Sequence, residues 1–176
     1  LEGRGGEGDN MEHEGNQIDL LIAVLVRFPQ IGTVHYEPDA KTLRLVFLVK
    51  DAPKDFDRFV RYYQSHLALF HNLRQEHVSA ASLKKSGNGE LTVIEVIRDL
   101  GTISLGELNL IVRLVSDYYG DCVIQEGSDM GEEDQVEQNY LIEMLLMSTT
   151  WRPLERLTGF RENGRVLVFS VPVGAR

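Results

Sequence analysis

Apolar residues recur every three or four positions after Pro53, from Phe56 to Phe70. This spacing places them on one side of an α-helix, so the pattern predicts a long amphipathic helix. A helix is also predicted at about residues 17–28, where Asn16 can serve as the N-cap and Pro29 ends the pattern.

Two further helices are predicted in the second half of the chain. Ser104 and Glu107 have the spacing of a capping box, and Gly120 can close the helix that follows them. The stretch 135–147 also has helical character, but its residues are apolar on most sides. Such a helix must be covered broadly by other elements.

Runs rich in β-branched residues, bounded by turn residues, predict three hairpins. The last hairpin turns at Asn163-Gly164, a dipeptide typical of a type I′ turn. A short strand is expected at 122–125, before an acidic loop. The hairpin strands are expected at about 33–37 and 43–50, at 77–85 and 91–98, and at 157–161 and 166–171.

A shift of 48 positions aligns LRLVFLVKD, residues 43–51, with LTVIEVIRD, residues 91–99. The shift also aligns apolar positions of the helices that follow, although strand and helix patterning alone could produce such a match. We therefore predict an α+β fold. It is a two-layer sandwich with a mostly antiparallel sheet built from two β-hairpin–helix units, plus a C-terminal helix and β-hairpin.

Residues 43–49 and 91–97 are apolar on both alternating faces, so both faces of these strands need cover. One helical layer covers only one face. The other must be covered by the helix at 135–147, by the C-terminal hairpin or by a second subunit. We therefore expect a homodimer, and the loop before the helix would let two protomers exchange it.

The net charge of −9 is concentrated in two Gly-rich segments, residues 1–16 and 126–137. Because the remaining chain is nearly neutral, no DNA partner is expected. We divide the chain into four parts. They are an acidic leader, disordered or foreign to the native chain (1–16), an α+β domain with the internal pseudo-repeat (17–126), an acidic loop (127–134), and a helix and hairpin that pack on the main domain or on a partner (135–176).

The composition, 43% hydrophobic and 26% charged, is typical of a globular protein. We expect no membrane span and no secretory leader. The single cysteine, Cys122, cannot form an internal disulfide, and we therefore expect a cytoplasmic protein. Cys122 could act as a nucleophile, but a lone cysteine in a short apolar strand is more often buried and inert.

The segment HLALFHNLRQEH places His66, His71 and His77 close together in the sequence. Five residues of helix rotate a side chain by about 140°, so His66 and His71 should point in different directions. No nearby cysteine and no HxxxH pair supports zinc. We therefore expect structural or surface histidines, no bound metal and no cofactor. Glu95 interrupts an apolar strand, where it could bind a ligand or lie at a solvated sheet edge.

No catalytic constellation is evident, so our first hypothesis is a non-catalytic interaction or regulatory module, homodimeric and with an unknown protein partner. The alternative is a small-ligand sensor or enzyme with a pocket between helices and sheet, for which the candidate residues are Glu95, His66 and His77. A second alternative is an RNA-associated factor. It would use the arginines of the last quarter of the chain, Arg152, Arg156, Arg161 and Arg165.

Overall fold

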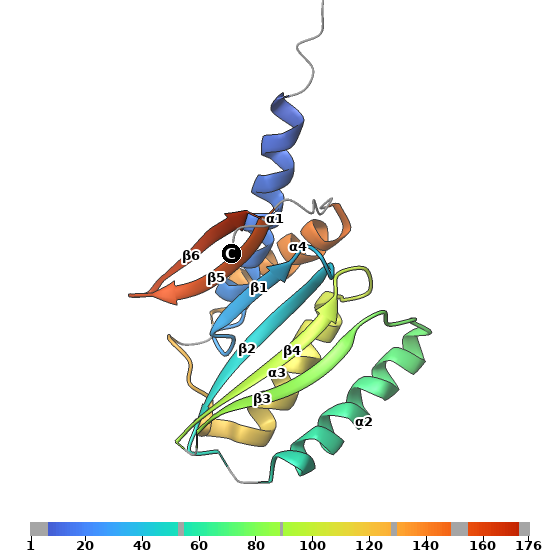
Figure 1. Ribbon diagram of the computed structural model, residues 1–176, viewed down its shortest axis with the longest axis vertical. Coiled ribbons are helices and arrows are strands. Elements are labelled where there is room, and N and C mark those ends of the chain that lie inside the picture. Colours follow the sequence, from blue (N-terminus) through green and yellow to red (C-terminus); the bar gives the residue numbers. More distant parts are fainter. Residues whose placement is uncertain (1–6, 53–54, 89, 128–129, 149–154, 173–176) are drawn as a thin grey trace, which may run out of the picture.

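A six-stranded antiparallel sheet forms the centre of the computed structural model, which describes residues 7–52, 55–88, 90–127, 130–148 and 155–172 (Figure 1). The order across the sheet is β3-β4-β2-β1-β5-β6. The strands are β1 (Thr33–Glu37), β2 (Thr42–Lys50), β3 (Ala81–Asn88), β4 (Leu91–Asp99), β5 (Glu155–Glu162) and β6 (Arg165–Pro172).

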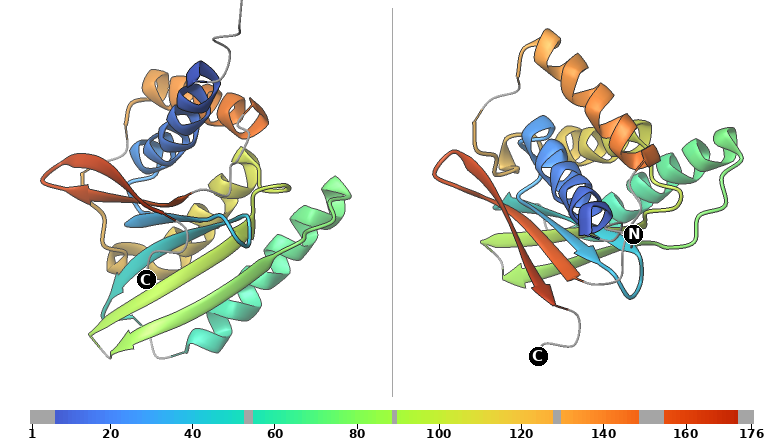
Figure 2. Two further views of the ribbon diagram at one scale, coloured as in Figure 1. Left: turned by 45° about the horizontal axis from the view of Figure 1, so that its top comes forward. Right: turned by 90° about the horizontal axis from the view of Figure 1, so that it is seen from above.

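The helices lie on one side of this sheet. They are α1 (Glu7–Arg27), α2 (Phe56–Arg74), α3 (Leu105–Tyr119) and α4 (Glu132–Ser148). Figure 2 shows α1, α2 and α3 over one face of the sheet and α4 on the outside of this helical layer. The α+β class, the antiparallel sheet and the C-terminal helix followed by a hairpin are thus confirmed.

The core lies between the sheet and the helices. Alternate residues of β2, from Leu43 to Val49, point into it and are almost fully buried, as are Ile94 and Val96 of β4. The two strands pair along their whole length, with Leu43 opposite Arg98 and Lys50 opposite Leu91. This pairing carries Arg98 on to the same buried face as Val96, because side chains two residues apart share a face.

The helix boundaries differ from the sequence prediction at two places, and the first is that α4 begins at Glu132, so the last three residues of the predicted acidic loop (127–134) belong to the helix. The second is the start of the chain. The first helix ends at Arg27, as expected before Pro29, but it begins at Glu7, so the prediction that Asn16 caps it is wrong. Residues 7–16, which we placed in the leader, continue the helix.

The strand predicted at 122–125 is also absent as an element. Gly120–Cys122 forms a single 3₁₀ turn, and Val123 makes an isolated bridge to Val49. The hairpin at Asn163-Gly164 is confirmed, and both residues have the positive φ that a type I′ turn requires.

We predicted that the helix at 135–147, the C-terminal hairpin or a second subunit covers the second face of the sheet. Within the chain, neither the helix nor the hairpin does so. The helix α4 packs on α1 and α3, and Arg27 of α1 donates to Asn139 of α4 at 2.8 Å. The hairpin β5–β6 extends the sheet beside β1 and does not fold across its face. Among the described residues no helix lies over that face (Figure 2). No described helix is long and apolar enough to cross a bilayer.

Candidate functional site

A buried ion pair joins the end of β4 to the first turn of α3. The side chain of Arg98 is 1% exposed and that of Glu107 is fully buried. Arg98 Nε donates to Glu107 Oε2 at 2.5 Å, and Arg98 Nη2 donates to Glu107 Oε1 at 3.0 Å. This two-pronged geometry is the strong form of the arginine–carboxylate bond.

Asp99 completes the neutralisation of Arg98. Arg98 Nη1 donates to Asp99 Oδ1 and, at 2.9 Å, to the carbonyl of Ala80, while Nη2 lies 3.1 Å from Thr102 Oγ1. Thr102 and the Ala80 N–H in turn donate to Asp99. The five donors of the guanidinium are therefore largely satisfied although the group is buried, as a buried charge requires.

The pKa values of these groups follow from burial and pairing. Burial alone would lower the pKa of Arg98, but its hydrogen bonds and charge contacts with Glu107 and Asp99 raise it above the ordinary value. Burial would likewise raise the pKa of Asp99, yet the Ala80 N–H, Thr102 and Arg98 together lower it. Tyr63 faces the same network, and burial together with the Glu107 charge raises its pKa well above the ordinary value.

The capped start of α3 positions Glu107 in this pair. Ser104 caps α3 by accepting from the Glu107 N–H at 3.2 Å, which confirms the predicted N-cap. The Glu107 carboxylate turns inward to Arg98. Glu107 shares its helix face with Ile111 and Leu114, both buried, so the helix that packs on the sheet carries the carboxylate into the core.

Two residues at the end of α2 extend the network toward the surface. His71 Nε2 contacts Glu107 Oε1, and Glu76 lies close to both. Gln75 ends the helix in the left-handed conformation, with a φ of 54°, and the Glu76 N–H then donates to the His71 carbonyl at 3.1 Å. This turn at the end of the helix places Glu76 next to His71.

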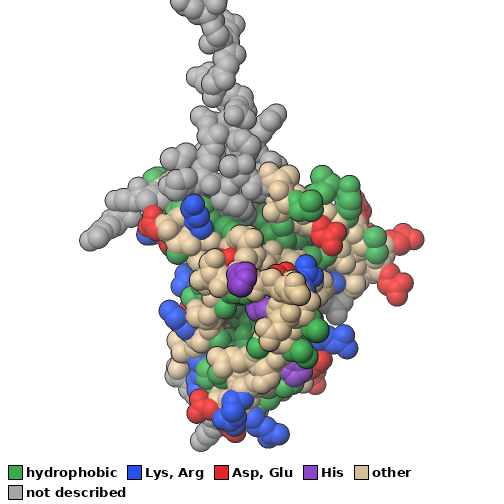
Figure 3. Space-filling model, turned by 90° about the vertical axis from the view of Figure 1, so that its right-hand side faces the viewer, with side chains coloured by type: hydrophobic (Ala, Val, Ile, Leu, Met, Phe, Trp, Pro, Cys, Tyr) green, Lys and Arg blue, Asp and Glu red, His purple; other side chains and the backbone are tan. Residues whose placement is uncertain are grey.

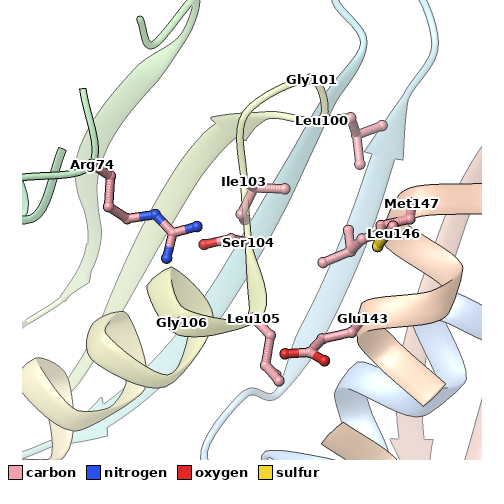
Figure 4. Close-up of a pocket in the computed structure, with 10 residues that line it drawn as sticks. All are labelled: Arg74, Leu100, Gly101, Ile103, Ser104, Leu105, Gly106, Glu143, Leu146 and Met147. Atoms are coloured by element: carbon pink, nitrogen blue, oxygen red, sulfur yellow. The ribbon is translucent and has the colours of Figure 1, made fainter. Parts of the chain in front are cut away.

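Two pockets lie near the network. One of about 260 Å³ lies between α2 and the β3–β4 strands, and its lining includes Tyr63, Leu67, His71 and Arg98. Another of about 530 Å³ lies between the end of α2, the start of α3 and α4. Figure 4 shows Arg74 reaching toward Ser104 in this second pocket. On the side of the molecule that carries α2, histidine side chains reach the surface (Figure 3).

The three residues that we predicted as ligand candidates are not brought together. His66 is exposed on α2, where its Nδ1 lies 2.7 Å from the Tyr62 carbonyl and its ring packs on Tyr62. His77 is exposed after the end of α2. Glu95 lies on β4, an internal strand, so the expectation of a sheet edge is wrong. Its side chain is on the uncovered face of the sheet.

Glu95 does have neighbours on that face. Arg44 Nη1 lies 3.6 Å from Glu95 Oε2, and His35 of β1 lies near both. His35 Nδ1 is 3.1 Å from Thr158 Oγ1. Burial and the Arg44 charge lower the pKa of His35, and they outweigh the opposite effect of Glu95.

Two of the four late arginines, Arg156 and Arg161, are engaged within the chain. Arg161 donates to the carbonyls of Leu25, Phe28 and Ile31 at the end of α1, and Arg156 Nε donates to Glu37 at 2.9 Å. Arg152 lies outside the described residues. Cys122 is half-buried in the 3₁₀ turn.

Sequence reasoning missed the Arg98–Glu107 pair, although the signals were present. Arg98 continues the buried register of Ile94 and Val96, and Glu107 lies in the apolar stripe of its helix. A charge at either position on its own would be costly, so two such charges of opposite sign on consecutive elements indicate a buried pair.

Comparison of the chain with protein-family models, curated proteins and solved structures finds no significant match.

Proposed function

We propose that this protein is a non-catalytic interaction module that forms a homodimer through the outer edge of β6. The observation that carries the proposal is the position of this strand. It is the last in the sheet, it pairs with β5 along all eight residues, and no described strand pairs with its other edge. An unpaired edge of this kind is a template for another strand.

The composition of β6 favours a second copy of the same strand as the partner. Its sequence, RVLVFSVP, carries one charge, at Arg165. An identical strand can pair with it in the antiparallel direction about a two-fold axis, without setting like charges opposite one another along its length. Leu167, Phe169 and Val171 project from the face opposite α1 and are more than one-third exposed, so a partner can bury them further.

The other apolar surface, on α4, is less suited to self-association. Val136, Tyr140, Met144 and Met147 form an exposed stripe along this helix. The same helix carries five carboxylates and no lysine or arginine. Two copies packed along this stripe would bring ten negative charges together, whereas β6 brings almost none.

Sedimentation velocity over a series of protein concentrations tests the proposal, with Phe169→Lys as the disruptive variant. Phe169 is 51% exposed, and burying the exposed half of a phenylalanine contributes about 1.2 kcal/mol, or about 2.5 kcal/mol for the two copies. We therefore expect Phe169→Lys to raise the dimer dissociation constant roughly sixtyfold. Val136→Lys, on the stripe of α4, is the matched control and should leave the dimer unchanged.

A protein that stays monomeric at every concentration would contradict the proposal. Disruption by Val136→Lys with no effect of Phe169→Lys would place the contact on α4 and would also contradict it.

A second candidate function, the sensing of a small ligand, is supported by the pocket of about 260 Å³ between α2 and β3–β4. Pockets that combine apolar walls with a few buried polar groups are typical ligand sites. Thermal-shift screening with nucleotides and amino acids tests this hypothesis. A stabilisation of several degrees by one compound, abolished by Ala68→Trp at the pocket wall, would support it.

A further inference from the structure

His71, Glu76 and Glu107 form a group of potential metal ligands between the end of α2 and the start of α3. One ligand atom of each residue lies within 4.8 Å of the other two. The group combines one imidazole with two carboxylates, which is a donor set that proteins use for zinc and related first-row cations.

Each carboxylate is oriented by an arginine. Arg74 Nε donates to Glu76 Oε1 at 2.7 Å, and Arg98 Nε donates to Glu107 Oε2 at 2.5 Å. Outer partners of this kind fix the direction of a metal ligand and are a regular part of metal sites. The two carboxylates are thereby held near His71 before any ion binds.

The remaining oxygen of Glu76 gives an independent indication of a ligand. Glu76 Oε2 is buried and has no hydrogen-bond partner among the described residues. A buried carboxylate oxygen without a partner is costly, and the cost is relieved when a cation binds it. This oxygen, beside His71 and Glu107, is therefore available to bind a cation.

We propose that His71, Glu76 and Glu107 bind one divalent transition-metal ion, with Zn²⁺ bound more tightly than Mn²⁺, in keeping with the usual order of affinities. The two carboxylates offer the ion two negative charges, and Asp99 balances the charge of the buried Arg98 behind them. The His71 and Glu76 side chains are 13% and 19% exposed, which gives the ion a path from solvent and room for water as a further ligand. This proposal opposes our sequence prediction of no metal site and is independent of the proposed dimer.

Isothermal titration of the full chain with Zn²⁺, after removal of bound metal with a chelator, tests the proposal. We expect one ion per chain, and we expect His71→Ala and Glu76→Gln each to weaken binding at least about tenfold. His66→Ala and His77→Ala are the matched controls, since both histidines are exposed on or after the same helix and lie outside the group. The far-ultraviolet circular dichroism of each variant shows whether it is folded.

A second measurement separates the proposed site from weak binding by surface histidines. The ¹⁵N resonances of the His71 ring should shift on addition of Zn²⁺, while those of His66 and His77 should not. The absence of Zn²⁺ binding to the folded chain would overturn the proposal. Equal loss of affinity in His66→Ala and His71→Ala would also overturn it, because binding would then be adventitious. Glu107 is left unchanged in this test because it also pairs with the buried Arg98.

Discussion

Replacement of Glu107 by glutamine should destabilise the fold severely. The change removes the charge that faces Arg98, whose side chain is 1% exposed and is left with Asp99 alone as its counter-charge. Two unit charges about 4 Å apart interact by about 4 kcal/mol at an effective dielectric constant of 20. Breaking one partner of a buried pair costs about 3–5 kcal/mol. We expect Glu107→Gln to lower the free energy of unfolding by about this amount.

Urea unfolding at pH 7, followed by circular dichroism at one fixed protein concentration, measures this loss. The fixed concentration matters because dimerisation would also change apparent stability. Glu143→Gln, on an exposed carboxylate of α4, is the control and should change stability by less than about 0.5 kcal/mol.

A double-mutant cycle makes the test decisive. Arg98→Met leaves Glu107 buried without its main partner and should cost about as much as Glu107→Gln, whereas Arg98→Met combined with Glu107→Gln removes both charges and should cost less than the sum of the two single changes. A loss below about 1 kcal/mol for Glu107→Gln, or strict additivity in the cycle, would refute the reasoning.

Three further outcomes follow from the structure. Ser104→Ala removes the N-cap of α3 and should cost about 1 kcal/mol in the same urea assay. Gly159→Val should cost about 1–3 kcal/mol, because even a Cβ at this position would lie 2.9 Å from Leu25. Since the pKa of folded His35 is below its unfolded value of 6.5, stability should fall as the pH falls from 6.5 through the folded pKa. His35→Gln should remove this part of the pH dependence, and an unchanged profile would contradict the assignment.

Helices and turns could be predicted where their formation depends on residues that are adjacent in the sequence. The helix after Pro53 and the turn at Asn163-Gly164 depend on spacing and on backbone preference, both of which can be read from adjacent residues. The cover of the sheet could not be predicted in this way. The helix α4 is apolar on several sides, and its sequence does not indicate whether it packs on the sheet or on other helices.

The candidate site was harder to predict because its members come from separate elements. His71 and Glu107 are 36 residues apart, and their contact depends on how α2 packs beside α3. The spacing of His66 and His71 along one helix indicates that the two side chains diverge, but it does not indicate which neighbouring element each of them meets. Contact with Glu107 of α3 is what distinguishes His71 from His66.

The pairing of β1 with β5 has a consequence for synthesis on the ribosome. His35 and Thr158, which face each other in this pairing, are 123 residues apart. At about 5–20 residues per second, the ribosome takes roughly 6–25 s to make the intervening chain. During that time the nascent β1 has one open edge, and the carbonyls at the end of α1 lack the Arg161 that later binds them. The growing polypeptide therefore exposes an unpaired strand edge until its final hairpin emerges, and such an edge favours aggregation during synthesis.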